Sequence, residues 1–299
     1  MDALVIGFAW FSAALYAVMA VHKFIELSTM PVHLRLELYP VGHEPGEKRH
    51  YGGSYMEEVD WVKKPRHSSL VGEIIEMALE IVLFKRIRDE NPYGIWLFSM
   101  IMHWGLYLLL TWVFLLVVQA VFNLSAIQPV IEIVGFASFV MGAFGCTGLL
   151  FKRITVDGLK AYSAPVDYFN LLFQLSIFVT GIIAWAGDRS LANSSAYMEG
   201  VVSFSYTPVP AITLVNLMLF QLFLIYMPFS KLFHYFIKYF TWHKVIWDDG
   251  FSTKGSAMDK KIAEQLNKKV TWSGPHIVPG KTWLEEAQIT MTEEKKKDE

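Results

Sequence analysis

Long blocks of uncharged apolar residues constrain this chain more than any other feature of its sequence. Ala3–Val21 and Ile95–Phe122 contain no charged residue, and a helix needs roughly 20 residues to cross the hydrocarbon core of a bilayer. Three further blocks carry at most one acidic residue each: Ile127–Leu150, Pro165–Ala186 and Pro208–Ser230. Lipid offers backbone groups no hydrogen-bond partner, so blocks of this length must form helices. The sequence therefore predicts an all-α integral membrane protein with a bundle of five transmembrane helices.

The first block also has features of a secretory signal peptide. However, Met1-Asp2 supplies no basic n-region, and Ala3–Val21 is longer than the usual hydrophobic part of such a peptide. We therefore expect this block to be retained as a signal-anchor helix.

Basic residues are distributed unequally between the two sides of the predicted membrane. They lie after the first span, between the third and fourth spans, and after the fifth span, whereas Arg189 alone lies on the other side. The segments on that other side, Asn123–Ala126 and Gly187–Thr207, are too short for a separate domain. An excess of lysine and arginine in short loops marks the cytoplasmic side. We expect a multi-pass protein of the cytoplasmic membrane, with its N-terminus outside and its C-terminus in the cytoplasm.

Two longer polar segments lie on the predicted cytoplasmic side. Residues 26–93 end in a stretch, Ser68–Arg88, whose apolar residues recur at helical spacing; this predicts an amphipathic helix that lies in the membrane interface or docks a partner. The C-terminal segment carries four tryptophans, which is unusual for a disordered tail. We predict a transmembrane domain over residues 1–240 and a partner-docking tail over residues 241–299, ending in the solvated charge run Glu293–Glu299.

Cysteine and motif content exclude several classes of protein. Cys146 is the only cysteine, so this chain alone forms no disulfide and holds no iron–sulfur cluster. It lies among glycines of the third span, a pattern typical of close helix packing. Nucleic-acid, nucleotide and hydrolase motifs are absent. Any redox-active metal would need histidine ligands.

Two histidines fall inside predicted spans at similar depth. His103 lies about eight residues into the second span, roughly 12 Å deep at the rise of an α-helix. The apolar stretch of the fifth span continues past Ser230 to Phe240, which places His234 at a comparable depth. Two imidazoles on antiparallel helices can supply both axial nitrogens to one haem b. Alternatively, each imidazole bonds a backbone carbonyl or a hydroxyl group within the bundle.

Four nearby residues are further candidates for the same chemistry. Pro228 permits a kink that turns His234 inward, and Lys231 lies one turn before His234, where it could meet a haem propionate. His22 ends the first span and is either a membrane-surface residue or a ligand of a second haem or quinone. Asp167 begins the fourth span and either pairs with a loop cation or accepts a proton from a quinone. The remaining histidines lack metal-ligand spacing: His33, His43, His50, His67, His243 and His276.

Three stretches resemble the cytochrome b (gamma) subunit of respiratory nitrate reductase. They are LFKRITVDGLKAYSAPVDYFNLLFQLSIFVTGIIAW (Leu150–Trp185), MPFSKLFH (Met227–His234) and MHWGLYLL (Met102–Leu109). The resemblance covers all five spans and implies a haem b held by His103 and His234, with menaquinone as the membrane electron carrier. At the positions that ligate the second haem of that family this chain has Val113 and Asn216. A second haem with His22 as its single protein ligand remains open.

Other stretches resemble one branch of that family. MPVHLRLELYPVGHE, GGSYMEEVDWVKKPR and WSGPHIVPGKTWLEEA are similar to the haem subunits of heterodisulfide reductase and of the sulfite-reductase-associated membrane complex of sulfate reducers. This implies an oxidoreductase subunit of an anaerobic respiratory complex, which exchanges electrons between menaquinone and a cytoplasmic iron–sulfur protein of the heterodisulfide reductase type. Catalytic disulfide chemistry is expected on that partner, and further subunits and membrane lipid are expected beside it.

Two other functions remain open from the sequence. The first is a haem-free anchor that tethers a cytoplasmic complex to the membrane. The second is a transporter, which the lack of paired intramembrane charges and of inverted repeats disfavours.

Overall fold

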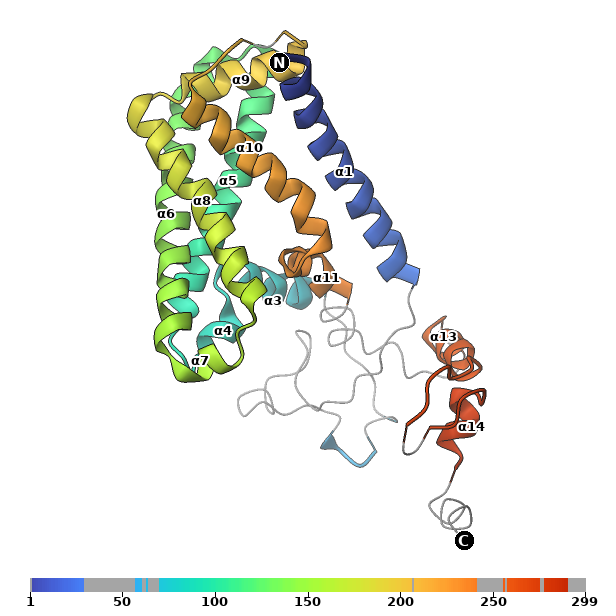
Figure 1. The fold of residues 1–299 in the computed structure, drawn as a ribbon. Coiled ribbons are helices and arrows are strands. Elements are labelled where there is room, and N and C mark those ends of the chain that lie inside the picture. The colour runs from blue at the N-terminus through green and yellow to red at the C-terminus, as the bar shows by residue number, and fades with distance from the viewer. Residues whose placement is uncertain are drawn as a thin grey trace. The chain divides into compact units, whose positions relative to one another are not determined.

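The computed structural model describes residues 2–29, 57–60, 63, 70–205, 207–240, 255, 257–274 and 277–289 (Figure 1). The chain divides into two units, Met1–Phe24 with Glu76–Tyr235 and Ile25–Ile75 with Phe236–Glu299. Several sequence predictions fall outside the described residues, namely those on the six loop and tail histidines and on Glu293–Glu299. The predicted domain boundaries stay a prediction.

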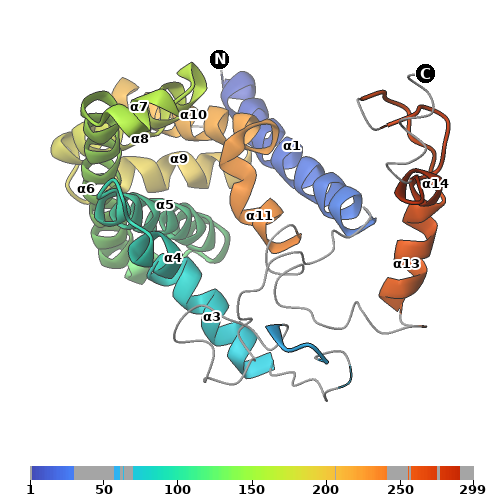
Figure 2. The same cartoon turned by 90° about the horizontal axis from the view of Figure 1, so that it is seen from below.

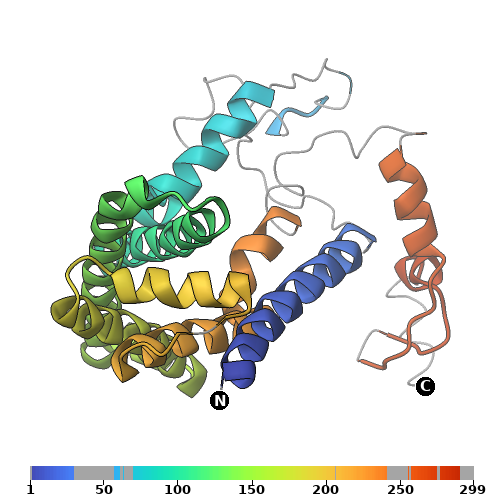
Figure 3. The ribbon, with the colours of Figure 1, turned by 90° about the horizontal axis from the view of Figure 1, so that it is seen from above.

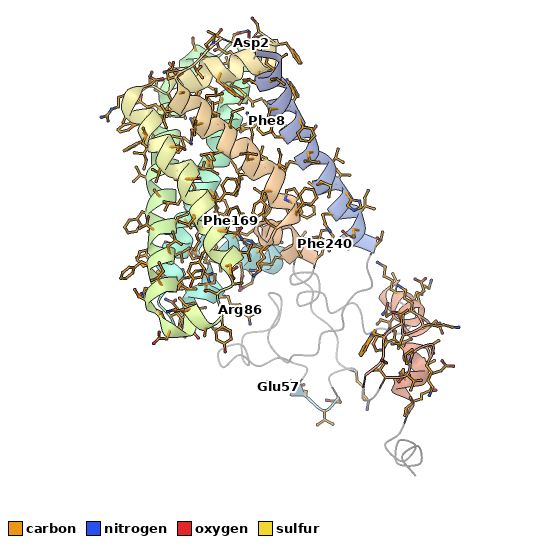
Figure 4. All side chains as sticks on the ribbon, in the orientation of Figure 1. Asp2, Phe8, Glu57, Arg86, Phe169 and Phe240 are labelled. Atoms are coloured by element: carbon orange, nitrogen blue, oxygen red, sulfur yellow. The ribbon has the colours of Figure 1, made fainter. Side chains whose placement is uncertain are left out.

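Within the residues that the structure describes, five helices are long and apolar enough to cross a membrane, which confirms the predicted fold class. They are α1 (Asp2–Thr29), α5 (Trp96–Phe122), α6 (Gln128–Thr155, after the 3-10 turn Ser125–Ile127), α8 (Pro165–Gly187) and α10 (Ala211–Tyr226). The short helix α7 (Asp157–Ala161) joins α6 to α8. Large apolar side chains point outward on these helices (Figure 4), and Phe169 on α8, labelled there, is 51% exposed. An apolar exterior of this kind suits lipid.

Glycines let the central helix α6 approach its neighbours closely. Helix α5 packs on α6, α6 packs on α8, and α8 packs on α10 (Figure 2). A Cβ atom on Gly105 of α5 would lie 2.4 Å from the backbone nitrogen of Gly142, and one on Gly142 would lie 2.3 Å from the Phe178 ring. Ser138 Oγ donates to the Gly105 carbonyl at 2.9 Å. Cys146 is buried, and a Cβ atom on its neighbour Gly145 would meet the backbone of Met102 on α5, so the small-residue stretch packs as its sequence predicted.

Helix α9 (Ala192–Ser203) lies across one end of the bundle (Figures 1 and 3). The sequence presented this segment as part of a loop, but the helix packs against both α5 and α10, with Tyr197 1% exposed. Trp10 of α1 donates from Nε1 to the Val201 carbonyl at 3.1 Å, and its ring stacks on Phe204 at 5.7 Å. Helix α9 therefore joins α1 to the rest of the bundle.

The amphipathic helix predicted over Ser68–Arg88 is two helices, so that prediction was wrong in its extent. Helix α3 runs over Leu70–Val82 and α4 over Lys85–Asp89. Between them Phe84 has a left-handed backbone, with φ 51° and ψ 45°, which ends the helical path. A side chain other than glycine rarely adopts this conformation, so the apolar periodicity gave no sign of the break.

The fifth span, Ala211–Phe229, agrees with the predicted block Pro208–Ser230, but its last turn is not α-helical. Helix α10 stops at Tyr226 and is followed by the 3-10 turns Met227–Phe229 and Lys231–Phe233, and then by α11 (His234–Lys238). Pro228 lacks the N–H that would continue the α-helical ladder. Ser230 then adopts an extended backbone, and its Oγ accepts from the Leu232 N–H at 3.2 Å. The permitted kink at Pro228 is thus a complete break.

The described part of the tail is folded, as its aromatic content indicated. It contains α13 (Ala257–Leu266) and α14 (Trp283–Ala287), and the rings of Trp272 and Trp283 lie 6.5 Å apart. Thr282 caps α14, because its Oγ1 accepts from the Glu285 N–H and its N–H donates to the Glu285 carboxylate. This backbone hydrogen bond lowers the pKa of the Glu285 carboxyl. Trp242 and Trp247 lie outside the described residues.

Candidate functional site

The structure brings His103 of α5 and His234 at the start of α11 together. Their ring centroids are 5.9 Å apart and their planes are inclined by 81°. The break at Pro228 makes this approach possible, because it frees the chain after α10 from the direction of that helix. His103 is half-buried, and His234 is exposed.

Backbone carbonyls orient both imidazole rings. Nδ1 of His103 lies 2.7 Å from the Ser99 carbonyl oxygen, and Nδ1 of His234 lies 3.1 Å from the Lys231 carbonyl oxygen. A carbonyl oxygen only accepts hydrogen bonds, so each bond requires the hydrogen to be on Nδ1. In a neutral imidazole the lone pair is then on Nε2, the arrangement found in metal-ligating histidines.

This donor set fits a haem better than a metal ion held by protein alone. The described residues contain no group of three or more histidine, cysteine or acidic side chains that could hold a metal ion. A haem supplies its own four equatorial nitrogens and needs only two axial ligands. The His103 and His234 rings, with centroids 5.9 Å apart, are close enough that both could hold one such group.

Aromatic residues that the sequence analysis did not single out surround His103. The Phe84 ring lies 4.6 Å from the His103 ring, centroid to centroid, and the Tyr107 ring lies at 6.5 Å. Three side chains of α5 also donate hydrogen bonds to the carbonyls at the end of α3 and to that of Leu83, which follows it. Tyr107 Oη donates to Ile81 at 3.3 Å, Trp104 Nε1 to Val82 at 3.1 Å, and Trp96 Nε1 to Leu83 at 2.9 Å. The end of α3 is therefore held against the helix that carries His103.

Lys231 and Asp167, both candidate site residues, pair with each other. Lys231 Nζ lies 3.1 Å from Asp167 Oδ1, and the side chains are 64% and 17% exposed. Asp167 Oδ2 also accepts from the Ala164 N–H at 2.9 Å, at the start of α8. The ion-pair partner of Asp167 is thus Lys231, in the segment after α10, while Arg153 in the last turn of α6 donates to Ser163 Oγ. This pair ties the segment that precedes His234 to α8.

In the part of the chain that the structure describes, neither His22 nor Asn216 shares a hydrogen bond or a ring contact with the histidine pair. His22 is exposed on α1, and within the described residues its ring has no hydrogen bond or ring contact. Asn216 is 3% exposed and donates from Nδ2 to the Ile177 carbonyl at 2.7 Å and to Thr180 Oγ1 at 3.1 Å. It joins α10 to α8. The roles of His22 and Asp167 toward a quinone stay predictions.

One pattern in the sequence could have revealed some of the residues around His103. Trp96, Ser99, His103 and Tyr107 recur at intervals of three and four residues, so they lie along one side of α5. Hydrogen-bond donors on the same side as an intramembrane histidine indicate a polar neighbour. Phe84 gave no such signal.

Comparison with models of protein families, with curated proteins and with solved structures found no match to this chain.

Proposed function

We propose that this chain is the membrane cytochrome b subunit of an anaerobic respiratory complex. In this proposal it is an oxidoreductase subunit that exchanges electrons between menaquinone and a cytoplasmic iron–sulfur protein of the heterodisulfide reductase type. The observation that carries the proposal is the histidine pair, with ring centroids 5.9 Å apart and each Nδ1 on a backbone carbonyl. The sequence resemblance supplies the class of partner.

Each residue of the site has a distinct role in this function. Haem b, when bound, supplies a reversible one-electron carrier. His103 and His234 would hold its iron through Nε2, and the carbonyls of Ser99 and Lys231 would fix the orientation of the two rings. Lys231 lies three residues before His234, so its ammonium group could pair with a haem propionate. That contact would replace its ion pair with Asp167.

A reduced-minus-oxidised visible spectrum of the purified protein tests the proposal. We expect the bands of a low-spin haem b in the wild type and their loss in both His103→Ala and His234→Ala, because each variant lacks one axial ligand. The helices should still insert, since insertion depends on apolar length. Normal spectra in both variants would contradict the assignment, and a wild type without haem would favour the anchor function.

The matched control is His22→Ala, which removes the exposed histidine of α1. If His22→Ala leaves both the spectrum and the haem content per chain unchanged, the chain has no second haem on this residue. A halved haem content would instead assign one.

The proposed orientation places the α9 end of the bundle outside and the histidine pair nearer the cytoplasm. Reporter fusions after Ser125 and Ser194 should read as external, and fusions after Gly53, Gly158 and the C-terminus as cytoplasmic, because the basic loops stay inside. An external C-terminus would show that the orientation is reversed or that the number of spans is different.

The proposed partner contacts the folded part of the tail. Trp272 and Leu284 are 53% and 42% exposed there, and exposed aromatic and aliphatic side chains favour protein contacts. Deleting Trp272–Ala287 should release the iron–sulfur partner from membranes and leave the haem spectrum intact. Deleting Glu293–Glu299 should leave both the partner bound and the spectrum intact. Full retention of the partner by the first variant would rule out this docking site.

A further inference from the structure

We propose that Phe84 is a positioning residue for His103 and that the end of α3 carries its ring there. This inference rests on the proposed function, since it concerns the orientation of a haem ligand. It is built on three observations within one unit of the molecule: the capped end of α3, the backbone of Phe84, and the contact of its ring with the imidazole.

Aromatic donors fix the end of α3 on α5. The last carbonyls of a helix have no partner within that helix, and lipid supplies none. Here the consecutive carbonyls of Ile81, Val82 and Leu83 accept from Tyr107, Trp104 and Trp96 at 2.9 to 3.3 Å. Since all three donors belong to α5, the position of this corner is set by the helix of His103.

The chain then holds Phe84 in a conformation that its side chain disfavours. A left-handed residue directly after a helix is usually glycine, which has no Cβ to clash. Strained backbone persists where the surrounding structure determines it, and such positions cluster at functional sites. Two contacts hold Phe84 from the α4 side. Lys85 pairs with Glu76 at 2.9 Å, and the Arg88 N–H donates to the Phe84 carbonyl at 2.9 Å.

The Phe84 side chain, held by this strained backbone, lies against the imidazole of His103. The Phe84 and His103 ring centroids are 4.6 Å apart with an interplanar angle of 48°, and Nδ1 of His103 is bonded to Ser99. The two contacts together limit rotation of the imidazole about its Cβ–Cγ bond. The orientation of an axial ligand tunes the metal that it holds, so Phe84 controls the spectroscopic properties and the reduction potential of the haem.

The variant Phe84→Gly tests the role of the aromatic ring separately from that of the left-handed backbone, because it removes only the side chain. Glycine keeps the left-handed conformation and relieves its strain, so the variant folds. We expect haem to be retained, with a shifted midpoint potential and a shifted or broadened low-field electron paramagnetic resonance signal. Phe84→Tyr keeps an aromatic ring and should restore both values. Trp104→Phe, which removes the donor to Val82 but keeps aromatic bulk, should cause a smaller shift in the same direction.

Leu83→Ala is the matched control, because it alters the same corner without touching the ring. It should leave the potential and the resonance signal of the wild type unchanged. If Phe84→Gly also leaves both unchanged while His103→Ala loses the haem, this inference is wrong and the proposed function stands. If the wild type holds no haem, both are overturned.

Discussion

The two ends of the helix bundle satisfy their polar groups in different ways. At the α9 end a network centres on the Gln128 side chain, which accepts from Gln119 at 2.7 Å and from Ser195 at 3.0 Å and donates to the Ser190 carbonyl at 2.6 Å. At the histidine end, backbone carbonyls accept from side chains of neighbouring turns and helices, as Ser99 does for His103. The first end is closed by a side-chain network, and the second is ordered around two imidazoles.

In the proposed function, this difference would combine rigidity at one end of the bundle with ligand binding at the other. Side chains that bond one another hold helices together but have little capacity left for a ligand. A ring oriented through Nδ1 by a carbonyl keeps its Nε2 chemistry for a metal. Irregular backbone occurs at both ends: Phe84 is left-handed and two 3-10 turns follow α10 at the histidine end, while Asn123, Leu191 and Phe204 are left-handed at the α9 end.

The largest expected loss of stability comes from disrupting the close packing of α5 on α6, two helices that extend to both ends of the bundle. Gly105→Ala places a Cβ 2.4 Å from the backbone nitrogen of Gly142, and backbone atoms cannot rotate away. We expect a loss of about 3 kcal/mol of stability, measured by thermal unfolding in detergent. Gly187→Ala is the control, because nothing lies within 4 Å of its added Cβ. Equal melting temperatures for the two variants would show that α5 and α6 can separate without penalty.

A smaller effect is expected from opening the side-chain network at the α9 end. Gln128→Leu removes three hydrogen bonds and leaves the 4% exposed Gln119 without this partner, which should cost about 1–3 kcal/mol. Gln119→Leu removes only one of these bonds and should cost less. Neither variant should alter the haem spectrum, since the network lies at the other end. A changed spectrum would show that the two ends are coupled.

The smallest effect is expected from the ion pair at the histidine end. Asp167→Asn keeps an oxygen that can accept from the Ala164 N–H and removes only the charge that faces Lys231. Because the lysine is 64% exposed, the loss should be below about 1 kcal/mol and should diminish as salt is added. Melting temperatures at low and high salt measure it. A larger loss that salt does not reduce would mean that lipid or a partner shields the pair.

The transmembrane fold could be predicted from the sequence because lipid leaves uncharged blocks few alternatives. The glycines around Cys146 likewise indicated close packing. Helix α9 could not be predicted in the same way, because its buried face includes small and polar residues such as Ser194, Ser195 and Gly200 and therefore shows no apolar stripe.

The candidate site was only partly accessible from the sequence. Histidine depth could be counted along the spans, and this pointed to His103 and His234. The change from α-helix to 3-10 turns after Tyr226 gave no compositional signal, because apolar composition continues through residues whose backbone Pro228 has already diverted. The contact of Phe84 with His103 depends on a left-handed backbone that α5 enforces from a distance, and no local pattern reports such a constraint.

The clamp between α1 and the end of α9 affects how the protein is made. Trp10 bonds Val201 and stacks on Phe204, and Tyr16 bonds Tyr235 through their hydroxyl groups. Helix α1 leaves the ribosome some 190 residues before Val201, a wait of roughly 10–40 s at typical elongation rates. During that time α1 must persist in the bilayer by its own helical hydrogen bonds and apolar surface. A nascent chain arrested before Val201 would therefore carry α1 inserted but undocked, and accessible to membrane quality-control proteases.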